Sequence, residues 1–167
     1  MKRPALLVAT VTSVAMAVGV NVVDVPGSMV WFQRRTGGLG TLDTLPLAGA
    51  ARVHELLTLL GPDGRALYLR EIVLFDIAFP IALLAMVHLA LTAVWAPPWR
   101  RRLLLLPWSA FVIDLVENTS AAVLTTTYPD ESPALADGIG WLTALKFAAY
   151  AAGIVAVVVG GISSRRR

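Results

Sequence analysis

The sequence predicts an all-α fold, a membrane four-helix bundle made by a single domain over residues 1–167. Hydrophobic residues make up 57% of the chain and charged residues only 15%, whereas an average soluble domain has roughly 45–50% and 25%. The excess lies in four long apolar runs, and about twenty apolar residues are enough for a helix to cross a bilayer. The expected spans are residues 5–23, 72–95, 103–126 and 139–162.

The first apolar run has two interpretations. Lys2 and Arg3 precede a hydrophobic stretch with Ala-Met-Ala at residues 15–17, a pattern typical of a signal-peptide cleavage site. The apolar residues continue to Val23, which makes the run longer than the hydrophobic core of a typical signal peptide. We therefore expect a retained span and keep cleavage as the alternative.

The basic residues predict how the spans are oriented. Lys2 and Arg3, the run Arg100–Arg102 and the tail Arg165–Arg167 would all lie on one side of the bilayer. Positively charged loops and termini are favoured on the cytoplasmic side. We therefore expect a multi-pass protein of the plasma (inner) membrane with both termini in the cytoplasm. This placement of the arginines explains the net charge of +3 without a nucleic-acid partner.

The long connection between the first two spans, residues 24–71, is then external. Residues 47–60 are expected to form an amphipathic helix that lies flat on the outer membrane surface. Its apolar residues share one face: Val53, Leu56, Leu57 and Leu60. Gly61 is expected to stop this helix, and residues 62–64 to form a turn before the second span.

The composition excludes several kinds of chemistry. The chain has no cysteine, which excludes disulfides, Cys-ligated zinc, iron–sulfur clusters and thiol–disulfide exchange. Its two histidines, His54 and His88, fall on opposite sides of the predicted membrane, so a haem held by both is not expected. No metal site is predicted, and the residues do not identify a cofactor.

Four ionisable residues lie inside the predicted spans: Asp76, Asp114, Glu117 and Lys146. A charge at bilayer depth costs about 3 kcal/mol even on the mildest insertion scale. At about 1.5 Å of helix rise per residue, all four fall between the midplane and the outer surface, where Asn21 of the first span also lies. The sequence therefore predicts one polar pocket in the outer half of the bilayer.

The spacing of the polar residues agrees with their depth. Asp114, Glu117 and Asn118 form one stripe on the third span, and Lys146 and Tyr150 share a face of the fourth. Together with Asp76, these are the candidate pocket residues. The candidates for the pocket mouth lie outside the spans: Tyr68, Arg70 and His54. Anchoring at the membrane interface is the alternative role for Tyr68 and Arg70, and an ordinary surface position is the alternative for His54.

Proline adds a backbone group to the same layer. Pro80 follows Asp76 by one helical turn, and proline has no N–H to donate to the carbonyl four residues before it. The main-chain carbonyl of Asp76 is therefore expected to be free for another partner.

The third span needs partners to be stable in a bilayer. Residues 103–126 contain eleven Leu, Ile, Val or Phe residues, which contribute about −3 to −7 kcal/mol, whereas the two carboxylates cost about +5 to +7 kcal/mol. We expect Lys146 to pair with one carboxylate only, that of Glu117. Three acids around one base leave a charge deficit, which proton uptake, a bound cation or water must meet.

Several motifs accompany the polar residues: GRALYLR at residues 64–70, Phe79-Pro80, DLVEN at residues 114–118, Tyr128-Pro129 and Lys146. As a set they resemble a group of small bacterial four-span membrane proteins to which no activity is assigned. The resemblance covers about residues 47–150. It implies the four-span architecture and supplies no function.

Three functions are compatible with this pattern. The first is a pocket that binds or carries a small molecule, an ion or a proton. The second is an intramembrane enzyme acting on a lipid or quinone-like substrate, with Glu117 or Asp114 as general base or metal ligand. The third is a structural or accessory subunit of a membrane complex, in which the polar residues only join helices. The lipid bilayer is the expected partner, and association with a second copy or another subunit stays open.

Overall fold

The computed structural model describes residues 2–165 and contains helices but no strand within this range. The elements in chain order are α1 (Lys2–Val22), α2 (Met29–Arg35), the 3₁₀ helix η1 (Leu42–Thr44), α3 (Ala50–Val94), α4 (Trp99–Leu103), α5 (Leu105–Thr127) and α6 (Pro133–Arg165). The predicted all-α class is confirmed. Arg166 and Arg167, part of the basic tail used to predict orientation, lie outside the described residues.

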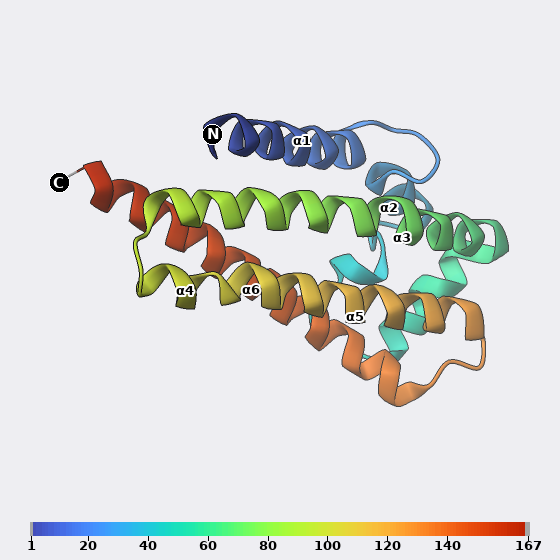
Figure 1. Cartoon of the computed structure of the whole chain (residues 1–167). Helices are drawn as coiled ribbons and strands as arrows, with labels where there is room; N and C mark the ends of the chain where they lie inside the picture. The colour runs from blue at the N-terminus through green and yellow to red at the C-terminus, as the bar shows by residue number, and fades with distance from the viewer. Residues whose placement is uncertain (1, 166–167) are drawn as a thin grey trace.

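The long helices run side by side. Helices α3, α5 and α6 pack against one another, and α1 packs along α3 on the outside of this group (Figure 1). The start of α1, the end of α6 and α4 lie at one end of the bundle, which we call the arginine end because α4 carries Arg100–Arg102. The loop-rich end opposite holds α2, η1 and residues 128–132.

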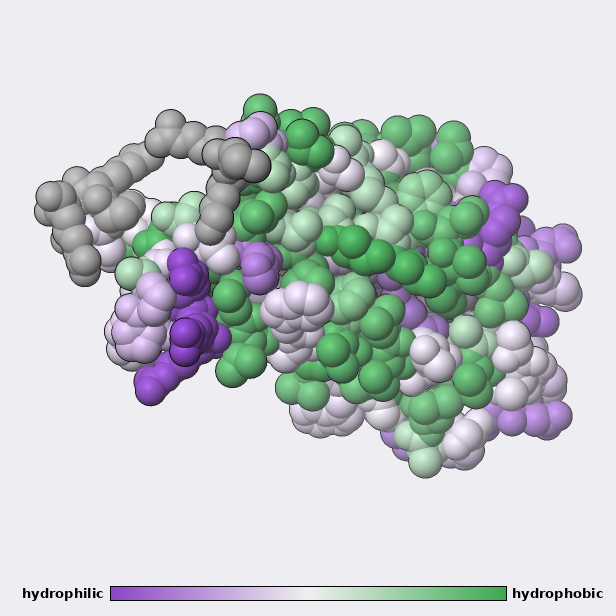
Figure 2. Space-filling view, viewed as in Figure 1, coloured by the Kyte–Doolittle hydropathy of each residue, from purple (hydrophilic) through white to green (hydrophobic). Residues whose placement is uncertain are grey.

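Three helices contain a stretch long and apolar enough to cross a bilayer: α1 (Pro4–Val22), α3 (Ala50–Val94) and α6 (Pro133–Ser163). Figure 2 shows hydrophobic side chains in a broad band over the middle of the molecule and hydrophilic ones toward both ends. These features indicate a multi-pass helical membrane protein. Helix α5 is also long enough to span a bilayer, with 23 residues. It contains Asp114 and Glu117, whose cost of insertion nearly cancels the gain from its apolar residues.

Helix α3 is two helices joined at Gly61. The backbone of Gly61 has φ 65° and ψ 175°, a conformation that glycine adopts without the steric cost of a side chain. The predicted stop at this position is confirmed. The turn predicted for residues 62–64 was wrong, because Pro62 lies in the first turn of the second part, where a missing N–H costs no hydrogen bond.

The apolar face of the predicted amphipathic helix packs against the rest of the protein. Its four predicted apolar residues are fully buried, in a hydrophobic core that also contains Tyr68 of the second part of α3, Leu124 of α5 and Ile139 of α6. Figure 1 shows this first part of α3 running across the loop-rich end. The prediction that this helix lies flat on the lipid surface was therefore wrong. Residues of α3, α5 and α6 near the loop-rich end cover its apolar face instead.

Polar contacts fix this helix in place. The main-chain N–H of Ala50 donates to Asp137 Oδ1 at 2.7 Å. At the break, the Arg35 Nε donates to the carbonyl of Leu60 at 2.8 Å, and Arg65 Nη1 donates to that of Leu57 at 2.9 Å. The two arginines satisfy carbonyls that the helix end would leave without partners.

Candidate functional site

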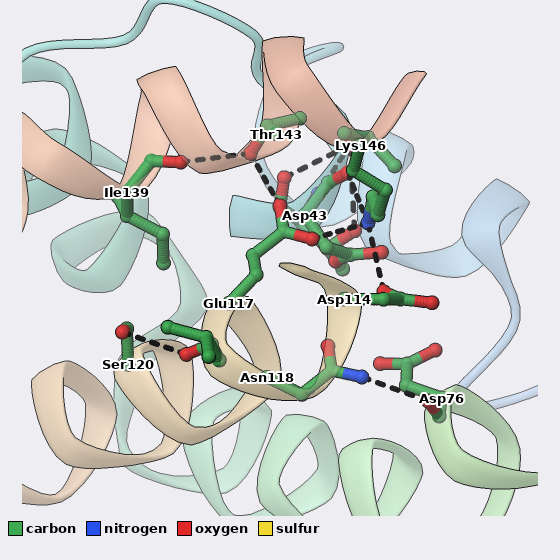
Figure 3. A network of polar contacts seen from close by, with 12 residues as sticks. Asp43, Asp76, Asp114, Glu117, Asn118, Ser120, Ile139, Thr143 and Lys146 are labelled. Carbon is green, nitrogen blue, oxygen red and sulfur yellow. Dashed lines mark hydrogen bonds and ion pairs between the residues drawn. The ribbon is translucent and has the colours of Figure 1, made fainter. Parts of the chain in front are cut away.

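Lys146 of α6 lies at the centre of the buried charges (Figure 3). Its Nζ is 3.2 Å from Asp114 Oδ1 and also forms an ion pair with Glu117 Oε2. The three side chains are 7%, 6% and 0% exposed, in the order Lys146, Asp114, Glu117. The predicted convergence of these three residues is confirmed. The prediction of a single partner for Lys146 was wrong, because the two acids are one helical turn apart on α5 and both reach the ammonium.

Glu117 is enclosed by its partners. Besides the ion pair with Lys146, its Oε1 accepts a hydrogen bond from the Thr143 hydroxyl, and no part of Glu117 is exposed. Thr143 was missed because a threonine in an apolar helix usually bonds to its own backbone, as Thr143 also does with the carbonyl of Ile139. Glu117 and Thr143 thus join α5 to α6 in the interior of the bundle.

Asp114 lies between Lys146 and a tyrosine. The Tyr150 hydroxyl donates to Asp114 Oδ2 at 3.3 Å, and both Asp114 and Tyr150 line a cavity. Tyr150 and Lys146 reach Asp114 together because they are one turn apart on α6, as the sequence predicted. Asp114 is therefore the acid that connects the buried ion pairs with the cavity.

Asn118 binds the backbone of α3. Its Nδ2 donates to the main-chain oxygen of Asp76 at 2.7 Å, the carbonyl that was expected to be free because Pro80 cannot donate to it. The expectation is confirmed, and the partner is a member of the predicted stripe. The carboxylate of Asp76 itself has no hydrogen bond or ion pair with any residue in the described range, and it lines the cavity.

Asp43, in η1, is a member of the cluster that the sequence did not reveal. Its main-chain oxygen lies 3.4 Å from Lys146 Nζ, and its carboxylate accepts a hydrogen bond from the Tyr68 hydroxyl at 3.2 Å. Converting residue number to depth works only within a continuous helix, so it gave no position for a residue in the long connection. The apolar neighbours Leu42 and Leu45 were the available signal.

The three candidates for the pocket mouth are placed differently. Tyr68 is buried, 1% exposed, and donates a hydrogen bond to Asp43, a residue of the cavity lining. His54 contacts Glu131, with 2.7 Å between Nδ1 and Oε1, and does not line the cavity. Arg70 has an exposed side chain 3.6 Å from Glu71 and does not line the cavity. None of the three residues lines the cavity, so a position at its mouth stays a prediction.

The cavity has a volume of about 330 Å³ and lies in the half of the bundle nearer the loop-rich end. Its ionisable lining residues are Asp43, Asp76, Asp114 and Lys146. Its other lining residues are Met16, Ala17, Val20, Asn21, Met29, Thr44, Phe75, Phe79, Pro80, Leu83, Phe147 and Tyr150. A mainly apolar cavity with a few converging polar groups is the usual form of a small-molecule site.

Within residues 2–165, no three His, Cys, Asp or Glu side chains are grouped so that they could hold a metal ion. The chain matches no protein-family model, no curated protein and no solved structure. The function must therefore be inferred from the cavity itself.

Proposed function

We propose that this chain is a four-span membrane protein that binds a small molecule in the cavity between α1, α3, α5 and α6. The observation that carries the proposal is the carboxylate of Asp76, which faces the cavity with no partner in the described residues. A charged group at membrane depth is costly, and a carboxylate without a partner contributes nothing to helix packing. Ligand binding explains this carboxylate better than interhelical packing does.

The remaining charges have a structural role beside the cavity. Glu117, Thr143 and Lys146 form a closed set of contacts between α5 and α6. This set offsets part of the cost of inserting the two acids, so that α5 can serve as the fourth span. Interhelical hydrogen bonds contribute only about 0.6 kcal/mol on average. Helix packing alone would therefore not offset the cost of placing the Asp76 carboxylate in the bilayer as well.

We further propose that the loop-rich end is external and the arginine end cytoplasmic, in agreement with the preference of arginine for the cytoplasmic side. The cavity then lies in the outer half of the bilayer.

A second cavity nearer the arginine end, about 250 Å³, has no ionisable residue in its lining. The polar lining therefore stops part-way through the bundle, which favours binding from the outer half over passage across the membrane.

Cysteine labelling on intact cells tests both the cavity and the orientation, since the natural chain has no cysteine. We expect Ala17→Cys, in the cavity lining, to react with small charged methanethiosulfonates added outside. Val18→Cys is the matched control at the same depth, because Val18 is 51% exposed on the lipid side. Ser132→Cys should react from outside and Ser164→Cys should not.

At least a tenfold faster reaction at position 17 than at position 18 is the expected result. Reagents of both charges are used, the trimethylammonium-ethyl and the sulfonato-ethyl compound. If neither modifies Ala17→Cys faster than Val18→Cys, the cavity is closed to outside molecules and the proposed function is wrong. Labelling of Ser164→Cys instead of Ser132→Cys would reverse the orientation.

A further inference from the structure

The acids around the cavity outnumber the bases. Asp43, Asp76 and Asp114 line the cavity, and Glu117 lies next to it against Lys146, the one base in the lining. The Lys146 ammonium already lies against Asp114, Glu117 and the main-chain oxygen of Asp43. These three contacts use the three N–H groups of the ammonium, so the Asp76 carboxylate has no cation of its own. A positively charged ligand would supply one.

Behind the cavity, whose lining does not include Asn118, a buried amide oxygen has no hydrogen-bond partner among the described residues. Asn118 is 4% exposed, and its Oδ1 has no hydrogen-bond partner in the described residues. The bond from Nδ2 to the main-chain oxygen of Asp76 fixes the orientation of the amide. Figure 3 shows the Oδ1 turned to the side on which the Asp114 carboxylate lies. An acceptor without a donor therefore faces a region that already holds carboxylates, and a buried acceptor without a partner costs about 1–3 kcal/mol.

The rest of the lining suits an organic ion. Phe75, Phe79 and Phe147 line the cavity with aliphatic side chains between them. Aromatic faces attract cations within about 6 Å of the ring centre, as Phe147 already does with Lys146 Nζ at 5.3 Å. A volume of about 330 Å³ is far more than one inorganic ion needs, and it falls in the range of small-ligand pockets.

The cavity borders the groove between α1 and α6. Helix α1 packs along α3, and its Met16, Ala17 and Val20 line the cavity opposite Phe147 and Tyr150 of α6. Phe147 and Phe75 are 46% and 40% exposed, so part of the lining faces the surface that we assign to lipid. A ligand with an apolar body could therefore reach the cavity from within the bilayer.

We propose that the ligand is a lipophilic organic cation, an ammonium with an apolar or aromatic body. This inference rests on the proposed function and identifies the class of molecule that the cavity holds. The ammonium group would lie beside the Asp76 carboxylate, and the apolar body among the phenylalanines. The Asp76 carboxylate would act as the counter-ion and Lys146 would keep its own partners.

Two molecules of the same shape test the charge directly. Benzyltrimethylammonium and neopentylbenzene differ by the exchange of a charged nitrogen for a carbon, and benzenesulfonate supplies the opposite charge. Binding to the purified full chain in lipid nanodiscs is measured by calorimetry. We expect benzyltrimethylammonium to bind at least tenfold more tightly than either of the other two compounds.

Asp76→Asn should weaken the binding of benzyltrimethylammonium at least tenfold. The variant should fold normally, because only the main chain of Asp76 has a structural partner. Asp130→Asn, which removes an exposed acid in the 128–132 connection, is the matched control and should leave binding unchanged.

Equal binding of the neutral compound, or an unchanged affinity in Asp76→Asn, would overturn the cationic class and leave the cavity a binding site for neutral molecules. If benzyltrimethylammonium does not bind while Ala17→Cys is labelled, this inference fails and the proposed function stands. If Ala17→Cys is not labelled either, both fail.

Discussion

Replacing Lys146 with methionine should destabilise the bundle by about 3–5 kcal/mol, the typical cost of removing one partner from a buried ion pair. The reason is that Asp114 and Glu117 would then face each other in the interior with no base between them. Denaturant unfolding of the purified protein in mixed micelles measures this change. Arg70→Met removes an exposed cation and should change the free energy of unfolding by less than about 0.5 kcal/mol.

A double-mutant cycle separates the ion pair from other effects of the lysine. Glu117→Gln removes one of the two acids, so the Lys146→Met/Glu117→Gln double variant should be less destabilised than the sum of the single variants. Because Lys146 contacts both acids, the pair Lys146→Met and Asp114→Asn should also be non-additive. Strict additivity in both cycles would mean that the lysine does not meet these acids in the folded protein.

Gly140→Ala should be the most damaging change among the glycines of α6, by about 3 kcal/mol, the upper part of the usual cost of overpacking. A methyl group at Gly140 would meet the backbone of Leu47 and Ala48, which cannot rotate away as a side chain can. The N–H of Leu47 also donates to the Gly140 carbonyl at 2.7 Å. Separation of these two segments would therefore loosen the amphipathic helix at the loop-rich end.

Gly138→Ala is the matched control two residues earlier in the same helix. A methyl group there has no atom within 4 Å, and alanine is favoured over glycine inside a helix by about 0.5–1 kcal/mol. We expect this variant to be as stable as the natural protein or slightly more so. Equal destabilisation of the two variants in the same unfolding measurement would contradict the close packing of α6 on residues 47–48.

The apolar runs and the polar stripe could be predicted from the sequence because both depend on helical periodicity. Asp114 and Glu117 are one turn apart on a single helix, so their common face follows from the spacing. The free carbonyl of Asp76 followed from Pro80 in the same way. Each of these predictions needs only the geometry of one helix.

The predictions that failed depend on how different elements meet. Asp43 reaches the cluster because the long connection folds back onto the bundle, and no periodicity describes that path. The helix of residues 47–60 has the pattern of a surface-lying membrane helix, but an apolar face is covered equally well by protein. His54 was a candidate because it lies on the external helix, and its partner Glu131 comes from another connection, which the sequence pattern does not place.

An experimental structure of the full chain in a lipid nanodisc with benzyltrimethylammonium present is the most direct test of the cavity as a ligand site. We expect ligand density between α1 and α6, with the ammonium within about 5 Å of the Asp76 carboxylate, and Lys146 still in contact with Asp114 and Glu117. Helix α1 closed against α6, with Asp76 paired to a protein side chain and no space between them, would contradict the proposed binding function.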